Sequence, residues 1–126
     1  MSFGGKFVLE SRNNYDEFAA ASGASPEQIQ RGKSVHPTTE ISNNGDNYTV
    51  KRIFPNQTIT NSFKLGVPTE LSFVEGKKAT ATVTLEGGKL VMKGDKFSSV
   101  AEIEGGKLKE TLTFNGKTMT RWSTKA

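Results

Sequence analysis

The sequence KLKETLTFNGKTMTRW, residues 107–122, decides the fold class. Asn115-Gly116 stands between two runs in which apolar and polar residues alternate, which is the signal for two antiparallel strands joined by a two-residue turn. That turn sets Phe114 opposite Lys117. The same register pairs the residues farther from the turn: Leu112 with Met119, Glu110 with Arg121, and Leu108 with Ser123.

One face of this hairpin is apolar and is predicted to point inward. The inward set contains Leu108, Leu112, Phe114 and Met119, and the outward set contains Lys107, Lys109, Thr111 and Thr113. Because side chains alternate between the two faces of a strand, a shift of one residue would expose the whole apolar set. The register therefore also turns Glu110, Arg121 and Ser123 inward.

Turn signals recur along the chain at a spacing of about ten residues, which is typical of short strands in a sandwich or barrel. They are Asn44-Gly45, Pro55-Asn56, Gly66, Glu75-Gly76, Gly87-Gly88, Gly94-Asp95, Gly105-Gly106 and Asn115-Gly116. These eight turns delimit nine strands after Val35, and Gly5 to Glu10 supplies a tenth. The predicted fold class is all-β, and residues 1–126 are expected to form a single domain.

Two further turns set the register on the other side of the sheet. A two-residue Asn44-Gly45 turn predicts Ile41 opposite Tyr48 and Thr39 opposite Val50. A turn at Pro55-Asn56 pairs Val50 with Asn61, Arg52 with Ile59, and Tyr48 with Phe63. By the same alternation, Val83 and Leu85 on one strand and Leu90 and Met92 on the next are predicted to point inward. The turn at 74–78 allows two registers, and the apolar residues favour Leu71 and Phe73 pointing inward.

Two short helices are predicted between the first strand and Val35. Asn14 precedes Glu17 by three residues, which is the spacing of a capping box, and Gly23 can end this helix. A second capping box, Ser25 with Gln28, has Pro26 at the first helical position. This second helix is expected to reach about Gly32.

The predicted inner face is too polar for a dry core. It carries Thr39, Arg52, Asn61, Ser99, Glu110, Arg121 and Ser123 among apolar residues. A lone buried charge is very costly, whereas a water-filled cavity with a polar wall tolerates such groups. The sequence therefore predicts an internal cavity.

Composition narrows the functional classes. About a third of the residues (33%) are hydrophobic, there is no apolar run long enough to span a membrane, and the alternation after Met1 is unlike a signal peptide. The absence of cysteine excludes disulfides and thiolate chemistry and favours a reducing compartment, the cytoplasm. A net charge of +4 favours anionic partners or is simply the charge of a solvated surface. With His36 as the single histidine, neither a metal site nor a cofactor is expected.

The first 18 residues resemble the intracellular lipid-binding proteins, the fatty-acid-binding family. The resemblance rests on Gly5-x-Phe7-x-Leu9 followed by Asn14-Tyr15-Asp16-x-Phe18. Thr60-Asn61-Ser62-Phe63, Leu85-Glu86-Gly87 and Glu110-Thr111-Leu112-Thr113 are also similar to segments of that family. The resemblance implies a ten-stranded, lipocalin-like, up-and-down barrel (a clam), with a gap between its fourth and fifth strands and a lid of two helices. It also implies a noncatalytic carrier.

The C-terminal end resembles one branch of this family. Arg121-Trp122-Ser123 is similar to the Arg-x-Ser of the liver-type fatty-acid-binding and ileal or liver bile-acid-binding proteins, where other members have Arg-x-Tyr. Ala101 stands where many members have a second inward arginine. Phe7 replaces a tryptophan that is common in the family signature. The implied ligands are fatty acids or bile acids, with one or two molecules in the cavity.

Arg121 is the main candidate for holding an anionic head group, although it could instead pair only with Glu110. Ser123 and Thr39 are candidate hydroxyl ligands. Arg52 lies near a strand end, beside the opening through which a ligand is expected to enter the barrel. It is either solvated or facing the ligand. The remaining candidates line the cavity or the lid, where ordinary packing is an equal alternative: Ile41, Tyr48, Val50, Ile59, Asn61, Phe63, Leu71, Phe73, Val83, Met92, Ser99, Ala101, Leu112, Met119, Tyr15, Phe18 and Ile29.

Two other functional classes remain open. An oligonucleotide-binding barrel would gather basic and aromatic residues on one outer face. The lysines are instead spread over turns and strands, at 64, 77, 78, 89, 93, 96, 107, 109 and 117. A small isomerase would use Glu110 as its base, but no partner acid or oxyanion donor can be named. The expected partners are thus the lipid and, transiently, membrane surfaces, with a monomeric protein and no stable nucleic-acid partner.

Overall fold

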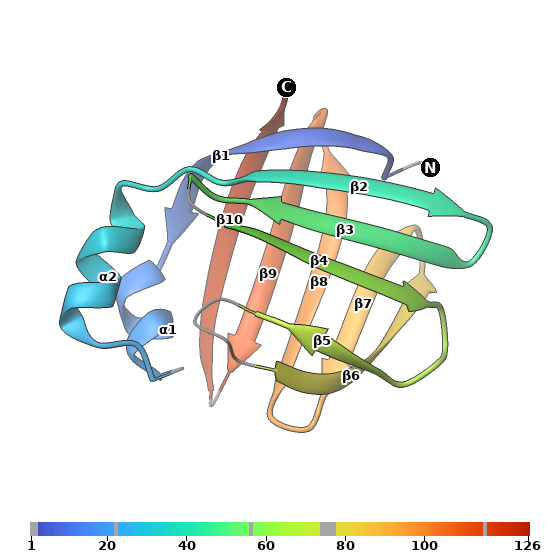
Figure 1. Cartoon of the computed structure of the whole chain (residues 1–126). Coiled ribbons are helices and arrows are strands. Elements are labelled where there is room, and N and C mark those ends of the chain that lie inside the picture. Colours follow the sequence, from blue (N-terminus) through green and yellow to red (C-terminus); the bar gives the residue numbers. More distant parts are fainter. Residues whose placement is uncertain (1–2, 22, 56, 74–77, 115) are drawn as a thin grey trace.

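The computed structural model describes residues 3–21, 23–55, 57–73, 78–114 and 116–126. In these residues ten antiparallel strands curve into a barrel, and two short helices lie at one end of it (Figure 1). The chain runs through β1 (Gly5–Asn13), α1 (Tyr15–Ala21), α2 (Pro26–Lys33), β2 (Thr38–Asn44), β3 (Asn47–Ile53), β4 (Thr58–Lys64), β5 (Thr69–Ser72), β6 (Lys78–Glu86), β7 (Lys89–Gly94), β8 (Phe97–Glu104), β9 (Lys107–Phe114) and β10 (Lys117–Lys125). The predicted all-β barrel with a two-helix lid is confirmed.

The sheet has two edges, because its strand order is β4-β3-β2-β1-β10-β9-β8-β7-β6-β5. Asn61 of β4 bridges these edges with its side-chain amide. Its Nδ2 donates to the carbonyl oxygen of Ser72 on β5 at 2.9 Å, and the Ser72 N–H donates to its Oδ1 at 2.7 Å. A side-chain amide offers the same donor and acceptor as a peptide group, so Asn61 takes the place of a backbone rung between β4 and β5.

Most of the predicted pairings are confirmed, including Glu110 opposite Arg121, Val50 opposite Asn61 and Val83 opposite Met92. The β2–β3 pairing is different from the prediction: Ile41 lies opposite Val50, and Thr39 lies opposite Arg52. The turn consists of Gly45 and Asp46, and Gly45 has a φ of 62° at the first central position, where a type II′ turn requires glycine. The shift is two residues, so each side chain keeps its predicted face. Asn56, Glu75-Gly76 and Asn115, which belong to three predicted turns, lie outside the described residues.

The first strand runs to Asn13 and not only to the predicted end at Glu10. Its pairing with β10 shifts between Leu9 and Ser11, which is a β-bulge. Leu9 lies opposite Ser123, but beyond the bulge Arg12 lies opposite Arg121. Because Arg121 faces inward, the bulge turns Arg12 onto the inner face as well.

The two helices begin differently. At α2 the predicted capping box is confirmed: Ser25 accepts from the Gln28 N–H, and Gln28 accepts from the Ser25 N–H. At α1 the predicted box is wrong, because Asn14 has a φ of 61° where an N-cap residue has an extended backbone. The Asn14 amide Nδ2 donates instead to the carbonyl oxygen of Thr118 on β10 at 3.4 Å.

β1 begins at the end of the barrel away from the helices (Figure 1), and its Phe7 belongs to the buried apolar core. The core contains Phe3, Phe7, Ile41, Tyr48, Val83, Leu90 and Leu108. Tyr48 and Phe63 stack there with ring centroids 5.8 Å apart. Leu85, predicted to share the inner face, is 48% exposed because it lies near the β6–β7 turn, beyond the packed residues.

Candidate functional site

An ion cluster centred on Glu110 of β9 is the main polar feature of the inner face. Arg121 of β10 donates to it twice, from Nε to Oε1 at 3.1 Å and from Nη2 to Oε2 at 3.2 Å. Arg52 of β3 also donates twice, from Nη1 to Oε1 at 3.1 Å and from Nη2 to Oε2. Both carboxylate oxygens are therefore held by two guanidinium groups, which is the strongest kind of charged hydrogen bond in proteins.

The cluster joins opposite walls of the barrel. Three strands, β2, β1 and β10, separate β3 from β9 in the order of the sheet, so Arg52 must cross the interior to reach Glu110. Arg52 Nη1 also donates to Thr39 Oγ1 on β2 at 2.8 Å. Thr39 is buried, and its hydroxyl oxygen helps to orient Arg52 by accepting this hydrogen bond.

The cluster carries one net positive charge, because one carboxylate faces two guanidinium groups. Burial by itself would raise the pKa of Glu110, but the charges of Arg121 and Arg52 and the hydrogen bonds they donate outweigh burial and hold that pKa well below its usual range. Burial lowers the pKa of Arg121, as does the charge of Arg52, while Glu110 opposes both. A guanidinium keeps its proton even so. The arrangement can attract an anion but cannot supply a free base.

The predicted pair of Glu110 and Arg121 is confirmed, and Arg52 is the partner that the sequence did not identify. From the sequence, Arg52 is expected either to be solvated or to face a ligand, and in the structure its guanidinium is bound to Glu110. No local pattern could reveal this contact, because it joins residues separated by 58 positions through the interior. Ala101 lies opposite Glu110 on β8 and is half-buried.

The other predicted lining residues divide by burial. Ile41, Tyr48, Leu71, Val83, Met119 and Ser123 are buried, whereas Val50, Ile59, Asn61, Phe63, Phe73, Met92, Ser99, Ala101 and Leu112 are half-buried. Met92, Ser99, Leu112 and Met119 form one inward row across β7, β8, β9 and β10. A close-packed core would bury every member of such a row. Met119 is buried, but Met92, Ser99 and Leu112 are partly exposed, which indicates that the inner face is incompletely filled.

The predicted lid residues do not come together at one place. Ile29 lines a hollow of about 400 Å³ between the two helices, with Asp16, Glu17, Ala20, Pro26 and Gln30. Phe18 is half-buried on α1. Tyr15 is not among the residues that line this hollow; the guanidinium of Arg12 lies over its ring, with Cζ 4.1 Å from the ring centroid.

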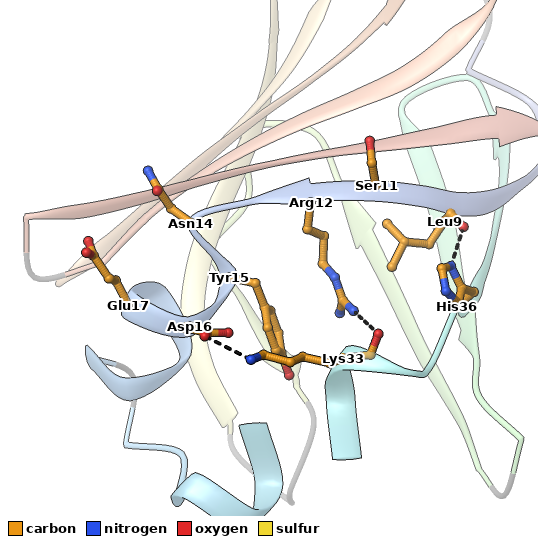
Figure 2. Close-up of a pocket in the computed structure, with 9 residues that line it drawn as sticks. All are labelled: Leu9, Ser11, Arg12, Asn14, Tyr15, Asp16, Glu17, Lys33 and His36. Carbon is orange, nitrogen blue, oxygen red and sulfur yellow. Dashed lines mark hydrogen bonds and ion pairs between the residues drawn. The ribbon is translucent and has the colours of Figure 1, made fainter. Parts of the chain in front are cut away.

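A second hollow, of about 640 Å³, lies where β1 meets the helices (Figure 2). Its lining consists of Leu9, Ser11, Arg12, Asn14, Tyr15, Asp16, Glu17, Lys33 and His36. His36 Nδ1 donates to the carbonyl oxygen of Leu9 at 2.9 Å, and Lys33 pairs with Asp16 at 3.0 Å. Except for Tyr15, none of these residues was predicted as a site residue. The bulge that brings Arg12 here has no clear signal in the sequence.

The described residues contain no group of three or more histidine, cysteine, aspartate or glutamate side chains that could hold a metal ion. Among the described helices, none is long and apolar enough to cross a membrane.

Comparison of the whole sequence with known proteins gives consistent matches. The model of the lipocalin / cytosolic fatty-acid binding protein family matches residues 1–126. Gastrotropin of Bos taurus is 39% identical over 126 residues, which are 99% of this chain and 98% of the relative. The liver fatty acid-binding protein of Schroederichthys bivius is 36% identical over 123 residues, or 98% of each chain.

Solved structures agree with the sequence matches. The zebrafish ileal bile acid-binding protein, crystallised with cholic acid, superimposes with a TM-score of 0.88 at 36% identity and 98% coverage of each chain. A fatty acid-binding protein from the brain of Drosophila melanogaster has a TM-score of 0.87 at 34% identity, covering 99% of this chain and 100% of that one. From its fold and its whole-length sequence matches, the chain belongs to the lipocalin and cytosolic fatty-acid-binding protein family.

Proposed function

We propose that this protein is a noncatalytic carrier that binds a long-chain fatty acid or a bile acid inside the barrel. The observation that carries the proposal is the inward-facing cluster of Arg52, Glu110 and Arg121, which places one net positive charge beside the inward apolar residues. A ligand with an apolar body and one anionic group matches that interior. The liver fatty acid-binding protein of Schroederichthys bivius and the cholic acid complex of the zebrafish protein support the same ligand class.

The apolar part of the ligand supplies the driving force. Each buried CH₂ group contributes about 0.8 kcal/mol, so a long acyl chain can outweigh the cost of association. Half-buried inward residues such as Met92, Ser99 and Leu112 are available to contact it. Thr39 and Ser123 are buried, and we propose for them a supporting role beside the ion cluster.

Two alternative functions have less support. As a catalytic base, Glu110 would have to accept a proton, but two arginines hold its pKa well below the usual range. As an oligonucleotide-binding surface, the outer face would need unpaired basic groups. Five lysines of the described residues, Lys6, Lys33, Lys89, Lys107 and Lys109, are paired with carboxylates, and the lysines as a whole are spread over many strands and turns.

The cellular setting is part of the proposal. We propose a cytoplasmic, monomeric protein of one domain that exchanges its ligand during transient contact with membrane surfaces and has no stable nucleic-acid partner. No cofactor is required, because binding and release of a lipid involve no chemical step.

The carrier function is tested by thermal unfolding of delipidated protein with oleate or a bile salt, below the concentration at which micelles form. A ligand that binds only the folded state raises its stability by RT ln(1 + [L]/Kd). We expect the unfolding midpoint to rise with ligand concentration. If neither ligand shifts it, the carrier function is wrong.

The position of the head group is tested by titrating Glu110→Gln and Arg121→Ala with a fatty acid and with the uncharged alcohol of the same chain length. Glu110→Gln frees both arginines and should tighten binding of the fatty acid, whereas Arg121→Ala should weaken it. Affinity for the alcohol should change little in either variant. Equal effects on acid and alcohol would place the head group away from the cluster.

A further inference from the structure

Both arginines of the ion cluster keep donors that Glu110 does not use. A guanidinium has five N–H donors, and two of them on one edge can bind a carboxylate. Arg121 gives Nε and Nη2 to Glu110, whereas Arg52 gives Nη1 and Nη2. In the residues that the structure describes, Arg52 Nε and Arg121 Nη1 meet no acceptor. Which arginine a ligand can reach therefore depends on the surroundings of each.

Arg121 is enclosed by its neighbours. It lies directly opposite Glu110 on the adjacent strand, so the backbone pairing of β9 and β10 keeps these two side chains together. Alternate residues of a strand share a face, and the two nearest residues on the inner face of β10, Met119 and Ser123, are both buried. A ligand inside the barrel thus has little access to Arg121.

The surroundings of Arg52 are more open. It is the last residue but one of β3, and Val50 on the same face of that strand is half-buried. Ile59, opposite Arg52 on the edge strand β4, is half-buried as well. Because the Arg52 side chain crosses from β3 to Glu110 on β9, its Nε lies between the walls of the barrel. Arg52 therefore combines free donors with apolar neighbours that a ligand can contact.

We propose that Arg52, and not Arg121, binds the anionic head group of the ligand. Arg121 is then a positioning residue, because it holds Glu110, and Glu110 holds the tip of Arg52. The carboxylates of the ligand and of Glu110 together balance the two guanidinium charges. Loss of Arg121 alone also weakens fatty acid binding, because Glu110 is then neutralised only by Arg52 and repels the ligand. The assignment rests on the proposed carrier function and names the residue that selects an anion over a neutral lipid.

The assignment is tested with two double variants that leave one arginine and no carboxylate in the cluster. Glu110→Gln with Arg121→Gln keeps Arg52, and Glu110→Gln with Arg52→Gln keeps Arg121, so the two clusters carry the same charge. The affinities for oleate and for oleyl alcohol are measured by titration. The variant with Arg52 should retain the wild-type preference for oleate. The variant with Arg121 should lose about tenfold of that preference, the factor for a hydrogen bond to a charged group. Equal losses, or a greater loss in the variant with Arg52, would overturn the assignment.

Lys51→Gln is the matched control. Lys51 precedes Arg52 on β3 but is exposed, so the change removes a cation from the same strand outside the barrel. The preference for oleate should stay within about twofold of the wild type, because solvent and salt screen an exposed charge. A loss as large as that caused by removing Arg52 would show that net charge governs the preference, against the assignment.

The wild type gives a second measurement that does not depend on the folding of a variant. In proton–nitrogen NMR spectra, the Arg52 Nε–H signal should shift with oleate and not with oleyl alcohol. The Arg121 Nε–H, already bonded to Glu110, should stay in place with both. A shift of Arg121 alone, or of neither arginine while oleate raises the unfolding midpoint, would overturn the assignment and leave the carrier function standing. An unfolding midpoint that neither lipid changes would contradict the carrier function itself, and the assignment with it.

Discussion

Arg52 on β3 crosses the interior of the barrel to hold Glu110 on β9, to which Arg121 is bound from the neighbouring strand. A ladder of backbone hydrogen bonds joins each strand only to its neighbours. The Arg52–Glu110 bridge is different, because it ties two opposite walls. Its loss should therefore affect both the stability of the barrel and the charge that a ligand meets inside.

Replacing Glu110 with glutamine should destabilise the protein more than replacing either arginine with glutamine. The change leaves two guanidinium groups facing each other in a largely buried place, which we expect to cost about 2–4 kcal/mol. Arg121→Gln should cost about 1–2 kcal/mol, since Glu110 keeps Arg52 as a partner. Urea unfolding of the three single variants measures the order. An arginine variant that is less stable than Glu110→Gln would contradict this account of the cluster.

The stability of the protein should depend on pH through Glu110. Because its folded pKa is depressed, the native carboxylate stays charged while the unfolded chain takes up a proton near pH ~4.3. The contribution of Glu110 to the free energy of unfolding is fully present above that pH. It is lost as the pH falls further, by about 1.4 kcal/mol per pH unit. The stability difference between wild type and Glu110→Gln, measured by urea unfolding, should narrow below about pH 4. A constant difference down to about pH 3 would show that the carboxylate is not stabilised in the native state.

Asn61 should determine how firmly β4 and β5 are held together. Asn61→Leu keeps a similar shape but removes both hydrogen bonds to Ser72, at a cost of about 1–2 kcal/mol. The Ser72 amide should then exchange much faster with solvent, while the amides of the β9–β10 hairpin are unchanged. Ser62→Ala is the control, because Ser62 neighbours Asn61 but bonds Thr49 on the same side of the gap. An unaltered exchange rate at Ser72 would show that the bridge is not formed in solution.

Gly32→Ala should loosen the packing between α2 and Tyr15. The added methyl group overlaps the Tyr15 hydroxyl, so the ring or the helix must move, at a cost of about 1–3 kcal/mol. Tyr15→Ala in the same chain should remove the overlap, making the double variant less destabilised than the sum of the two single changes. Thermal unfolding of the three variants gives the coupling free energy between positions 15 and 32. Strict additivity would mean that Tyr15 and Gly32 do not touch.

Local sequence determined the strands, their faces and most of their register. Turn residues such as Gly116, with a φ of 77°, determine where the chain reverses direction between two strands. The alternation of apolar and polar residues then determines which side chains point inward. The pairing of Glu110 with Arg121 follows from one hairpin, so it could be predicted. The Asn44-Gly45 pair does not fix the register by itself, because a glycine can occupy either central position of a tight turn and the two registers differ by two residues.

Tertiary structure alone decided which inward groups meet across the barrel and how the helices are attached. Arg52 finds Glu110 because the sheet closes on itself, and no local pattern encodes a contact through the interior. Arg12 reaches the end of α2 because a bulge reverses its face, which alternation by itself would have placed outward. Local hydrogen bonds and steric preferences involve residues that are close together in the chain, so they can be predicted from the sequence. Contacts across the interior depend on the curvature of the whole sheet, and that curvature exists only once the barrel has formed.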